Sequence, residues 1–99
     1  MITENGTCDA DVVAEDGTIH DTKRIGYILD YLGNLKRAVS EGYPVLGFQY
    51  WSLMDNFEWA EGYDPRFGLI YVDYATGKRT LKDSAWEYEK IIETNGAML

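Results

Sequence analysis

The chain has 99 residues, which is room for one domain at most. Its 17 acidic and 9 basic residues give a net charge of −8, which argues against nucleic acid or an anionic membrane as a partner because phosphate binding needs clustered Lys and Arg. We expect a cytoplasmic protein, since Cys8 is the only cysteine, no signal peptide is recognisable and no apolar run approaches the ~20 residues of a membrane span.

The N-terminal segment is predicted to contain the end of a strand and a long loop. Residues 1–3 are too few for more than the tail of a strand. Residues 4–21 contain the turn-forming pairs Asn5-Gly6 and Asp16-Gly17. The acidic residues of this loop lack the EF-hand pattern, so we predict no metal site, and nothing in the chain indicates a cofactor. His20 is predicted to serve the structure of the loop.

A helix is predicted over residues 22–41. Asp21 is a suitable N-cap, Gly42 a suitable residue beyond the C-terminus, and Pro44 prevents continuation. Arg24 falls off the apolar face of this helix. The apolar face is formed by Ile25, Ile28, Leu29, Leu32, Leu35 and Val39.

A buried strand is predicted over Val45–Tyr50, because this stretch is apolar and aromatic and follows a proline. Residues 54–66 show neither a helical nor a strand period and are predicted to form a long loop. Leu69–Val72 and Lys78–Leu81 flank a turn at residues 75–77, which predicts a small hairpin.

A second helix is predicted after the hairpin, where Ser84 and Glu87 have the spacing of a capping box and Gly96 ends the helix. The order of elements is then β-α-β-α, which is typical of an α/β protein with parallel strands. Two strands cannot complete such a sheet, and a (β/α)8 barrel needs ~250 residues. The sequence therefore indicates part of a larger barrel. The apolar stripe of the second helix is Ala85, Tyr88, Ile91 and Ile92.

Two predicted strand ends contain residues suited to sugar chemistry. Glu4 follows the first strand, and the aromatic-rich segment Trp51–Trp59 follows the second, with Glu58 between two aromatic residues. A pyranose presents an apolar face to an aromatic ring and hydroxyls to carboxylates. Taken alone, these features also suit a solvated turn at Glu4, a core or interface at the second strand end, and an ion pair between Glu58 and Arg66.

Longer motifs resemble glycoside hydrolase family 1, the β-glucosidase type. Ile2-Thr3-Glu4-Asn5-Gly6 matches the I-T-E-N-G nucleophile motif of that family, and Tyr50–Tyr63 matches W-S-L-x-D-N-F-E-W-x-x-G-Y. Arg66–Tyr74 and Lys82-Asp83-Ser84 continue the match in order. The resemblance implies that residues 1–99 run from the end of strand 7 through helix 8 of a TIM barrel, with no complete domain.

The resemblance also implies a role for each matching site residue. Glu4 is the expected catalytic nucleophile. Trp51 is the expected platform under the sugar, and Phe67 the wall near C6. Glu58 is expected to accept hydrogen bonds from the 4- and 6-hydroxyls, and Trp59 to donate one to the 3-hydroxyl.

The implied reaction is hydrolysis of a β-linked sugar by double displacement with retention. In the family the acid/base glutamate belongs to a T-x-N-E-P motif on an earlier strand, and no Asn-Glu-Pro occurs here, so we expect the 99 residues alone to be inactive. A carboxylate at Glu58 further implies an unphosphorylated glycone. The family also leads us to expect a cis peptide between Trp51 and Ser52.

Two further interpretations remain open at this stage. The chain could be a non-catalytic carbohydrate-binding module, or an interaction fragment that complements a barrel supplied by another chain. Because strand edges and helix faces are left without neighbours, we expect the rest of a barrel, or self-association, as the protein partner.

Overall fold

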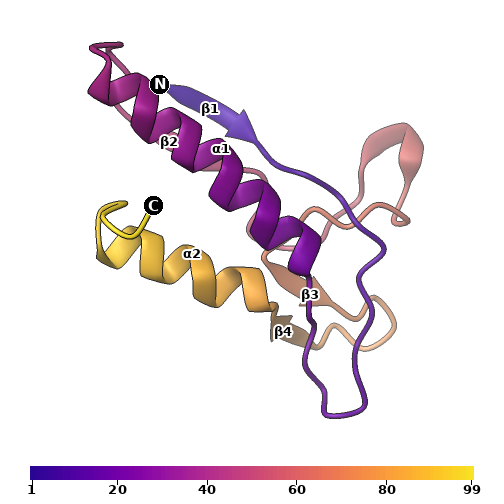
Figure 1. Ribbon diagram of the computed structural model, residues 1–99. Helices are drawn as coiled ribbons and strands as arrows, with labels where there is room; N and C mark the ends of the chain where they lie inside the picture. The colour runs from indigo at the N-terminus through magenta and orange to yellow at the C-terminus, as the bar shows by residue number, and fades with distance from the viewer.

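A computed structural model describes residues 1–99 and shows two helices packed beside a two-stranded parallel sheet, with a separate hairpin (Figure 1). β1 pairs with β2 in parallel, and β3 pairs with β4 antiparallel. The order β-α-β-α with a hairpin before the last helix was predicted correctly. The elements are β1 (Ile2–Asn5), α1 (Thr22–Ser40), β2 (Phe48–Tyr50), a 3-10 turn η1 (Trp59–Glu61), β3 (Ile70–Val72), β4 (Arg79–Leu81) and α2 (Asp83–Glu93).

A small apolar core lies between the two helices and β2. Phe48 and Tyr50 of β2 pack against it from the sheet side. The predicted apolar faces of the helices supply three of its four buried side chains, whereas Val39 and Ile92 of the same faces stay exposed. The core therefore fills only part of the apolar surface that the sequence provides. Its buried members are Ile28, Leu32, Leu69 and Ile91.

The starts of both helices differ from the predictions. Asp21 is the N-cap of α1, but its carboxylate makes no capping bond and instead accepts hydrogen bonds from the Ser84 backbone N–H (2.9 Å) and hydroxyl. α2 begins at Asp83 with Lys82 as N-cap, so the predicted capping box of Ser84 and Glu87 is wrong. Arg24 is fully buried rather than exposed, because it contacts the buried carboxylate of Asp21 at 2.6 Å.

The strands also differ in extent. Glu4 and Asn5 belong to β1 rather than to the following loop, and β2 covers only the last three residues of the predicted strand Val45–Tyr50. Leu46 is 87% exposed, so the first half of that segment is not buried. The reason is that β1 is the only strand beside β2, and its pairing begins where Ile2 N donates to Gly47 O at 2.9 Å.

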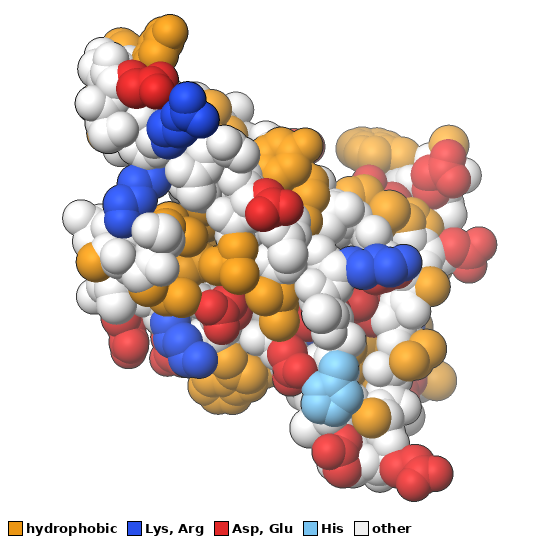
Figure 2. All heavy atoms as spheres, viewed as in Figure 1, with side chains coloured by type: hydrophobic (Ala, Val, Ile, Leu, Met, Phe, Trp, Pro, Cys, Tyr) orange, Lys and Arg blue, Asp and Glu red, His pale blue; other side chains and the backbone are white.

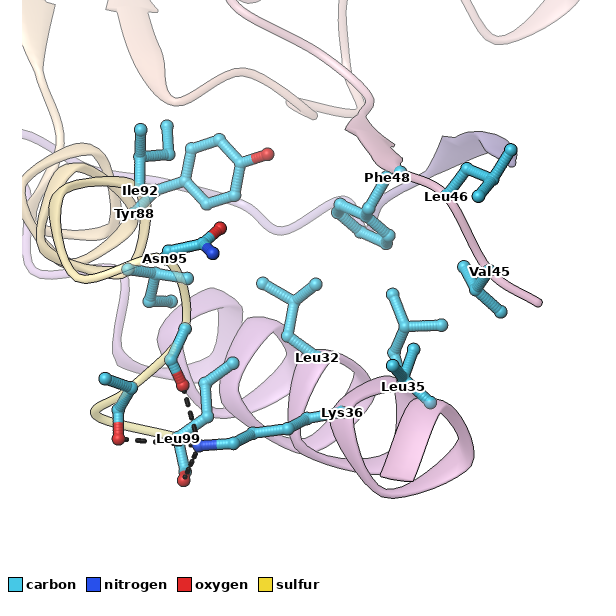
Figure 3. A pocket seen from close by; sticks show the side chains of 15 residues that line it. Leu32, Leu35, Lys36, Val45, Leu46, Phe48, Tyr88, Ile92, Asn95 and Leu99 are labelled. Atoms are coloured by element: carbon cyan, nitrogen blue, oxygen red, sulfur yellow. Dashed lines mark hydrogen bonds between the residues drawn. The ribbon is translucent and has the colours of Figure 1, made fainter. Parts of the chain in front are cut away.

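An apolar groove of about 540 Å³ opens where α1, the start of β2 and the end of α2 meet (Figure 3). Leu32 and Phe48 line it, and Tyr88 of α2 lies across it. Lys36 closes one end, where its ammonium donates to the carbonyls of Gly96 (2.9 Å) and Leu99 (3.1 Å). Neither helix is long and apolar enough to cross a membrane.

His20 lies on the surface beside carboxylates (Figure 2). Its contact with Asp83 holds the loop before α1 against the start of α2. Its Nδ1 is 2.6 Å from Asp83 Oδ2. The hydrogen bond to Asp83 and the charge of that residue raise the pKa of His20 above 6.5. The predicted structural role of His20 agrees with these contacts.

The His20–Asp83 pair should make stability depend on pH. Because the folded pKa of His20 is raised, its contribution is complete below the unfolded pKa near 6.5 and is lost as pH rises through the folded value. We expect His20→Gln to lower the unfolding midpoint at pH 5.5 and to leave it nearly unchanged at pH 9. Asp83→Asn should remove the same pH-dependent contribution to stability. If His20→Gln lowered the unfolding midpoint equally at both pH values, the His20–Asp83 pair would not be the source of the pH dependence.

Candidate active site

The parallel pairing of β1 and β2 brings two chemically distinctive strand ends together. Asn5 pairs with Tyr50, and the Trp51 backbone N–H donates to Asn5 O at 2.8 Å. Glu4, one residue before Asn5, and Trp51, one residue after Tyr50, therefore lie at the same edge of the sheet. The side chains of both residues are exposed.

β1 is irregular between Ile2 and Asn5, the span that contains Glu4. Ile2 pairs with Phe48 and Asn5 with Tyr50, so β1 advances three residues while β2 advances two. An extra residue of this kind is a β-bulge, which bends a strand and changes the direction of a side chain, and bulges are common beside active sites. The sequence pattern contained no sign of this irregularity.

Gly6 allows the two strand ends to approach each other. A Cβ at this position would lie 1.8 Å from the Trp51 carbonyl oxygen and 2.9 Å from its carbonyl carbon. Both atoms belong to the backbone, so no side-chain movement could relieve the clash. The predicted Asn5-Gly6 turn is therefore wrong: Asn5 lies in β1, and Gly6 is needed for close approach.

Gly6→Ala should separate Glu4 from the second strand end. We expect the variant to lose about 1–3 kcal/mol of stability through overpacking, and any catalysis that depends on this geometry to fall by roughly 10²-fold. Gly33→Ala is the matched control, because it lies within α1 with nothing within 4 Å of its Cβ and should be neutral or stabilising. Guanidinium denaturation tests both variants in this chain, and steady-state kinetics test them in a complete barrel that contains it. A Gly6→Ala variant that behaves like Gly33→Ala would contradict this account.

The segment after β2 folds back so that Glu58 meets Trp51. The indole Nε1–H of Trp51 donates to Glu58 Oε1 at 3.0 Å. The backbone of Glu58 is fixed on both sides, since its N–H donates to Gly62 O (2.8 Å) and its carbonyl accepts from Glu61 N (2.9 Å). The alternative ion pair between Glu58 and Arg66 is absent, because Arg66 contacts Asp55 at 2.6 Å.

Trp59 extends from the η1 turn into solvent. It is 85% exposed, and its φ of +44° is a backbone conformation that bulky residues rarely adopt. Such outliers are concentrated at ligand sites and switch regions, where the surrounding structure holds them in place. The large aromatic ring and its N–H donor are therefore free for a ligand.

Phe67 is half-buried and is held next to the start of this segment. Its carbonyl accepts hydrogen bonds from Ser52 N and from the Tyr50 hydroxyl, both at 3.3 Å. Burial raises the pKa of Tyr50 to about 12, so its hydroxyl remains a donor. The peptide between Trp51 and Ser52 is cis, as expected.

A buried ionic network lies behind these residues, and no sequence motif indicated it. It has three carboxylates and three cations, so its charges balance. Burial lowers the pKa of Arg24, but hydrogen bonds to Asp11 and Asp21 outweigh this and raise it overall. The members are Asp11, Asp21 and Asp55 with Arg24, Arg66 and Lys82.

The network does not resemble a metal centre. Asp11, from the middle of the acidic N-terminal loop, is neutralised by Arg24 (2.9 Å) and Lys82 (2.6 Å). No group of three or more His, Cys, Asp or Glu side chains in residues 1–99 is placed to hold a metal ion. The chemistry available at the strand ends is that of an exposed carboxylate, a second oriented carboxylate and aromatic rings.

Comparison with known proteins identifies relatives of this chain. The model of glycosyl hydrolase family 1 matches residues 1–97. β-Glucosidase A of Thermotoga maritima is 53% identical over 95 residues, covering 96% of this chain and 21% of that protein. A 6-phospho-β-galactosidase of Leptotrichia buccalis is 48% identical over 93 residues, covering 94% and 20%.

Solved structures agree with the sequence comparison. The family 1 β-glucosidase from Thermotoga maritima superposes with a TM-score of 0.94 at 53% identity, covering 96% of this chain and 21% of the other. A structure of the enzyme from that organism with a substituted glucoimidazole gives the same score. The chain thus spans about a fifth of the length of the relatives it matches.

Proposed function

Because the chain belongs to glycosyl hydrolase family 1, we propose that it carries the nucleophile and part of the glycone site of a retaining β-glycosidase. Residues 1–99 would run from the end of the seventh strand through the eighth helix of a (β/α)8 barrel. The observation that carries the proposal is the parallel pairing of β1 and β2, which puts Glu4 and Trp51 at one edge. In barrel enzymes, catalytic residues lie at the C-terminal ends of the strands.

The proposed reaction proceeds in two displacements. A carboxylate oxygen of Glu4 attacks the anomeric carbon, and the bond to the leaving oxygen breaks as a second carboxylic acid, ~5–5.5 Å away, protonates that oxygen. The same group then removes a proton from water, which attacks the anomeric carbon and releases Glu4 with net retention. The second carboxyl group would come from a segment outside these 99 residues.

The proposed sugar contacts follow from the geometry of the second strand end. Trp51 would lie under the sugar, and Phe67 would form the wall near C6. Glu58 would accept from the 4- and 6-hydroxyls, and its hydrogen bond to Trp51 (3.0 Å) supports this role by fixing the carboxylate. The exposed indole of Trp59 would donate to the 3-hydroxyl.

A hybrid enzyme tests the proposal. It contains residues 1–97 of this chain in place of the matching segment of the Thermotoga maritima β-glucosidase, and the residues keep the numbers used here. We expect it to hydrolyse an aryl β-glucoside, with the β-anomer of glucose as the first product by NMR. A folded hybrid that binds glucosides without hydrolysing them would instead favour the carbohydrate-binding interpretation.

The charge of Glu58 supports an unphosphorylated glycone, because a carboxylate at the 6-hydroxyl would repel a 6-phosphate. Sequence identity to relatives does not distinguish a phosphorylated from an unphosphorylated glycone, since a β-glucosidase and a 6-phospho-β-galactosidase match almost equally well. The hybrid should therefore prefer the β-glucoside to its 6-phosphate in kcat/KM. The reverse preference would remove the role proposed for Glu58.

The exposed apolar groove favours a related function, that of completing a barrel formed with the remaining four-fifths of such a protein. Leu46 and Val45 line this groove beside the core. The isolated 99-residue chain should therefore self-associate in size-exclusion chromatography and show no β-glucosidase turnover. A monodisperse, cooperatively melting monomer with turnover would contradict both expectations.

A further inference from the structure

We infer that Lys82 is a positioning residue, which couples the loop after Glu4 to the loop that carries Glu58; the inference rests on the proposed function. Lys82 is the N-cap of α2 and is fully buried. Its ammonium lies 2.6 Å from Asp11, in the loop after β1, and 2.8 Å from Asp55, in the loop after β2. One cation thus joins the segments that follow the two strand ends.

Through Asp11, Lys82 contacts the loop that follows β1. Asp11 also contacts Arg24 at 2.9 Å, and the same guanidinium donates to Arg66 O at 2.7 Å. That carbonyl accepts the backbone N–H of Asp9 as well, at 3.1 Å. The loop after Glu4 is therefore fixed against the residue that precedes Phe67.

Through Asp55, Lys82 contacts the loop that follows β2, and the Asp55 carboxylate accepts several hydrogen bonds there. Its Oδ1 accepts from Lys82 and from the Gly68 backbone N–H (3.0 Å), and its Oδ2 accepts from Arg66 (2.6 Å) and the Val72 N–H (3.3 Å). Glu58 follows only three residues later. The orientation of Asp55 consequently constrains where the Glu58 segment begins.

Loss of Lys82 should remove the cation shared by Asp11 and Asp55 and leave each of these carboxylates with one other cation. In Lys82→Met, Asp11 keeps Arg24 and Asp55 keeps Arg66. The two strand-end loops would then lose their shared cation, and the distance between the nucleophile and the sugar held by Glu58 would no longer be fixed. A displacement of about 1 Å in an active site can cost roughly 10²-fold in rate.

The test uses the hybrid enzyme and a 2-deoxy-2-fluoro-β-glucoside, in which attack by Glu4 on the anomeric carbon expels the leaving group and forms a slowly hydrolysed ester. The second-order rate constant of labelling, per folded site, should fall about 10²-fold in Lys82→Met. Leu32→Ala is the matched control, because it loses stability in the core without touching Lys82. Its labelling rate should equal that of the unmodified hybrid.

The labelling rates distinguish failure of the role of Lys82 from failure of the proposed function. If the unmodified hybrid is labelled and Lys82→Met is labelled at the rate of Leu32→Ala, Lys82 only stabilises the fold and the inference is wrong. If the folded unmodified hybrid is not labelled, the proposed function itself fails. Should Lys82→Met not fold, Asp11→Asn decides instead: it must slow labelling relative to Leu32→Ala at equal loss of stability, or the inference is overturned.

Discussion

Glu4→Gln in the hybrid enzyme is expected to lower kcat/KM for an aryl β-glucoside by roughly 10⁴-fold or more. The amide has the shape of the carboxylate but cannot form the glycosyl ester, and Glu4 is exposed, so the fold should be unaffected. Glu15→Gln is the matched control, because it also lies exposed between β1 and α1. Steady-state kinetics and circular dichroism measure both effects.

Replacing Glu4 with the smaller glycine allows a gain of activity to be measured as well as a loss. Glu4→Gly should be reactivated by azide, because the anion can occupy the space of the missing carboxylate and attack the anomeric carbon while the aglycone leaves. The product should be the α-glucosyl azide, with inverted configuration. Retention of more than a tenth of the activity in Glu4→Gln, or a β-azide product, would contradict the role of Glu4.

Arg24→Met is expected to lower the free energy of unfolding of the hybrid by about 3–5 kcal/mol. The guanidinium is fully buried between Asp11 (2.9 Å) and Asp21 (2.6 Å), and its removal leaves buried negative charge without its partner. Arg37→Ala is the control, because its pair with Glu41 is exposed and should contribute less than about 1 kcal/mol.

Guanidinium chloride denaturation measures both losses, provided that fluorescence and circular dichroism report the same transition. Equal losses for Arg24→Met and Arg37→Ala would mean that the network contributes no more than a surface ion pair. The double variant Arg24→Met/Asp21→Asn should recover part of the loss, because it removes the carboxylate charge that loses its ion-pair partner, whereas Asp11 keeps Lys82.

The sequence was sufficient to locate those elements whose signals lie within a short stretch of residues. Helical spacing located α1 over Thr22–Ser40 within one residue of the predicted end, and two short runs around a turn located the β3–β4 hairpin. The strand ends that carry Glu4 and Trp51 were also recognisable, because a parallel repeat places them at one edge. The motif resemblance then supplied the family, which the match over residues 1–97 confirmed.

Contacts between distant residues were not predictable from spacing. Asp21 and Ser84 both carry strong local signals for helix caps, but they are 63 residues apart and bind each other instead. Arg24 was predicted to lie off the apolar face of α1, yet it is buried, because Asp11 makes its burial favourable. In each case a long-range hydrogen bond outweighed a local preference, and only the three-dimensional structure could reveal the partner.

The most direct test of the account is to find the residue that a 2-deoxy-2-fluoro-β-glucoside labels in the hybrid enzyme. Proteolysis and tandem mass spectrometry of the inactivated enzyme should place the sugar on Glu4. A label on Glu58 or on another carboxylate, or inactivation that persists at the same rate in Glu4→Gln, would contradict the central claim that Glu4 is the nucleophile.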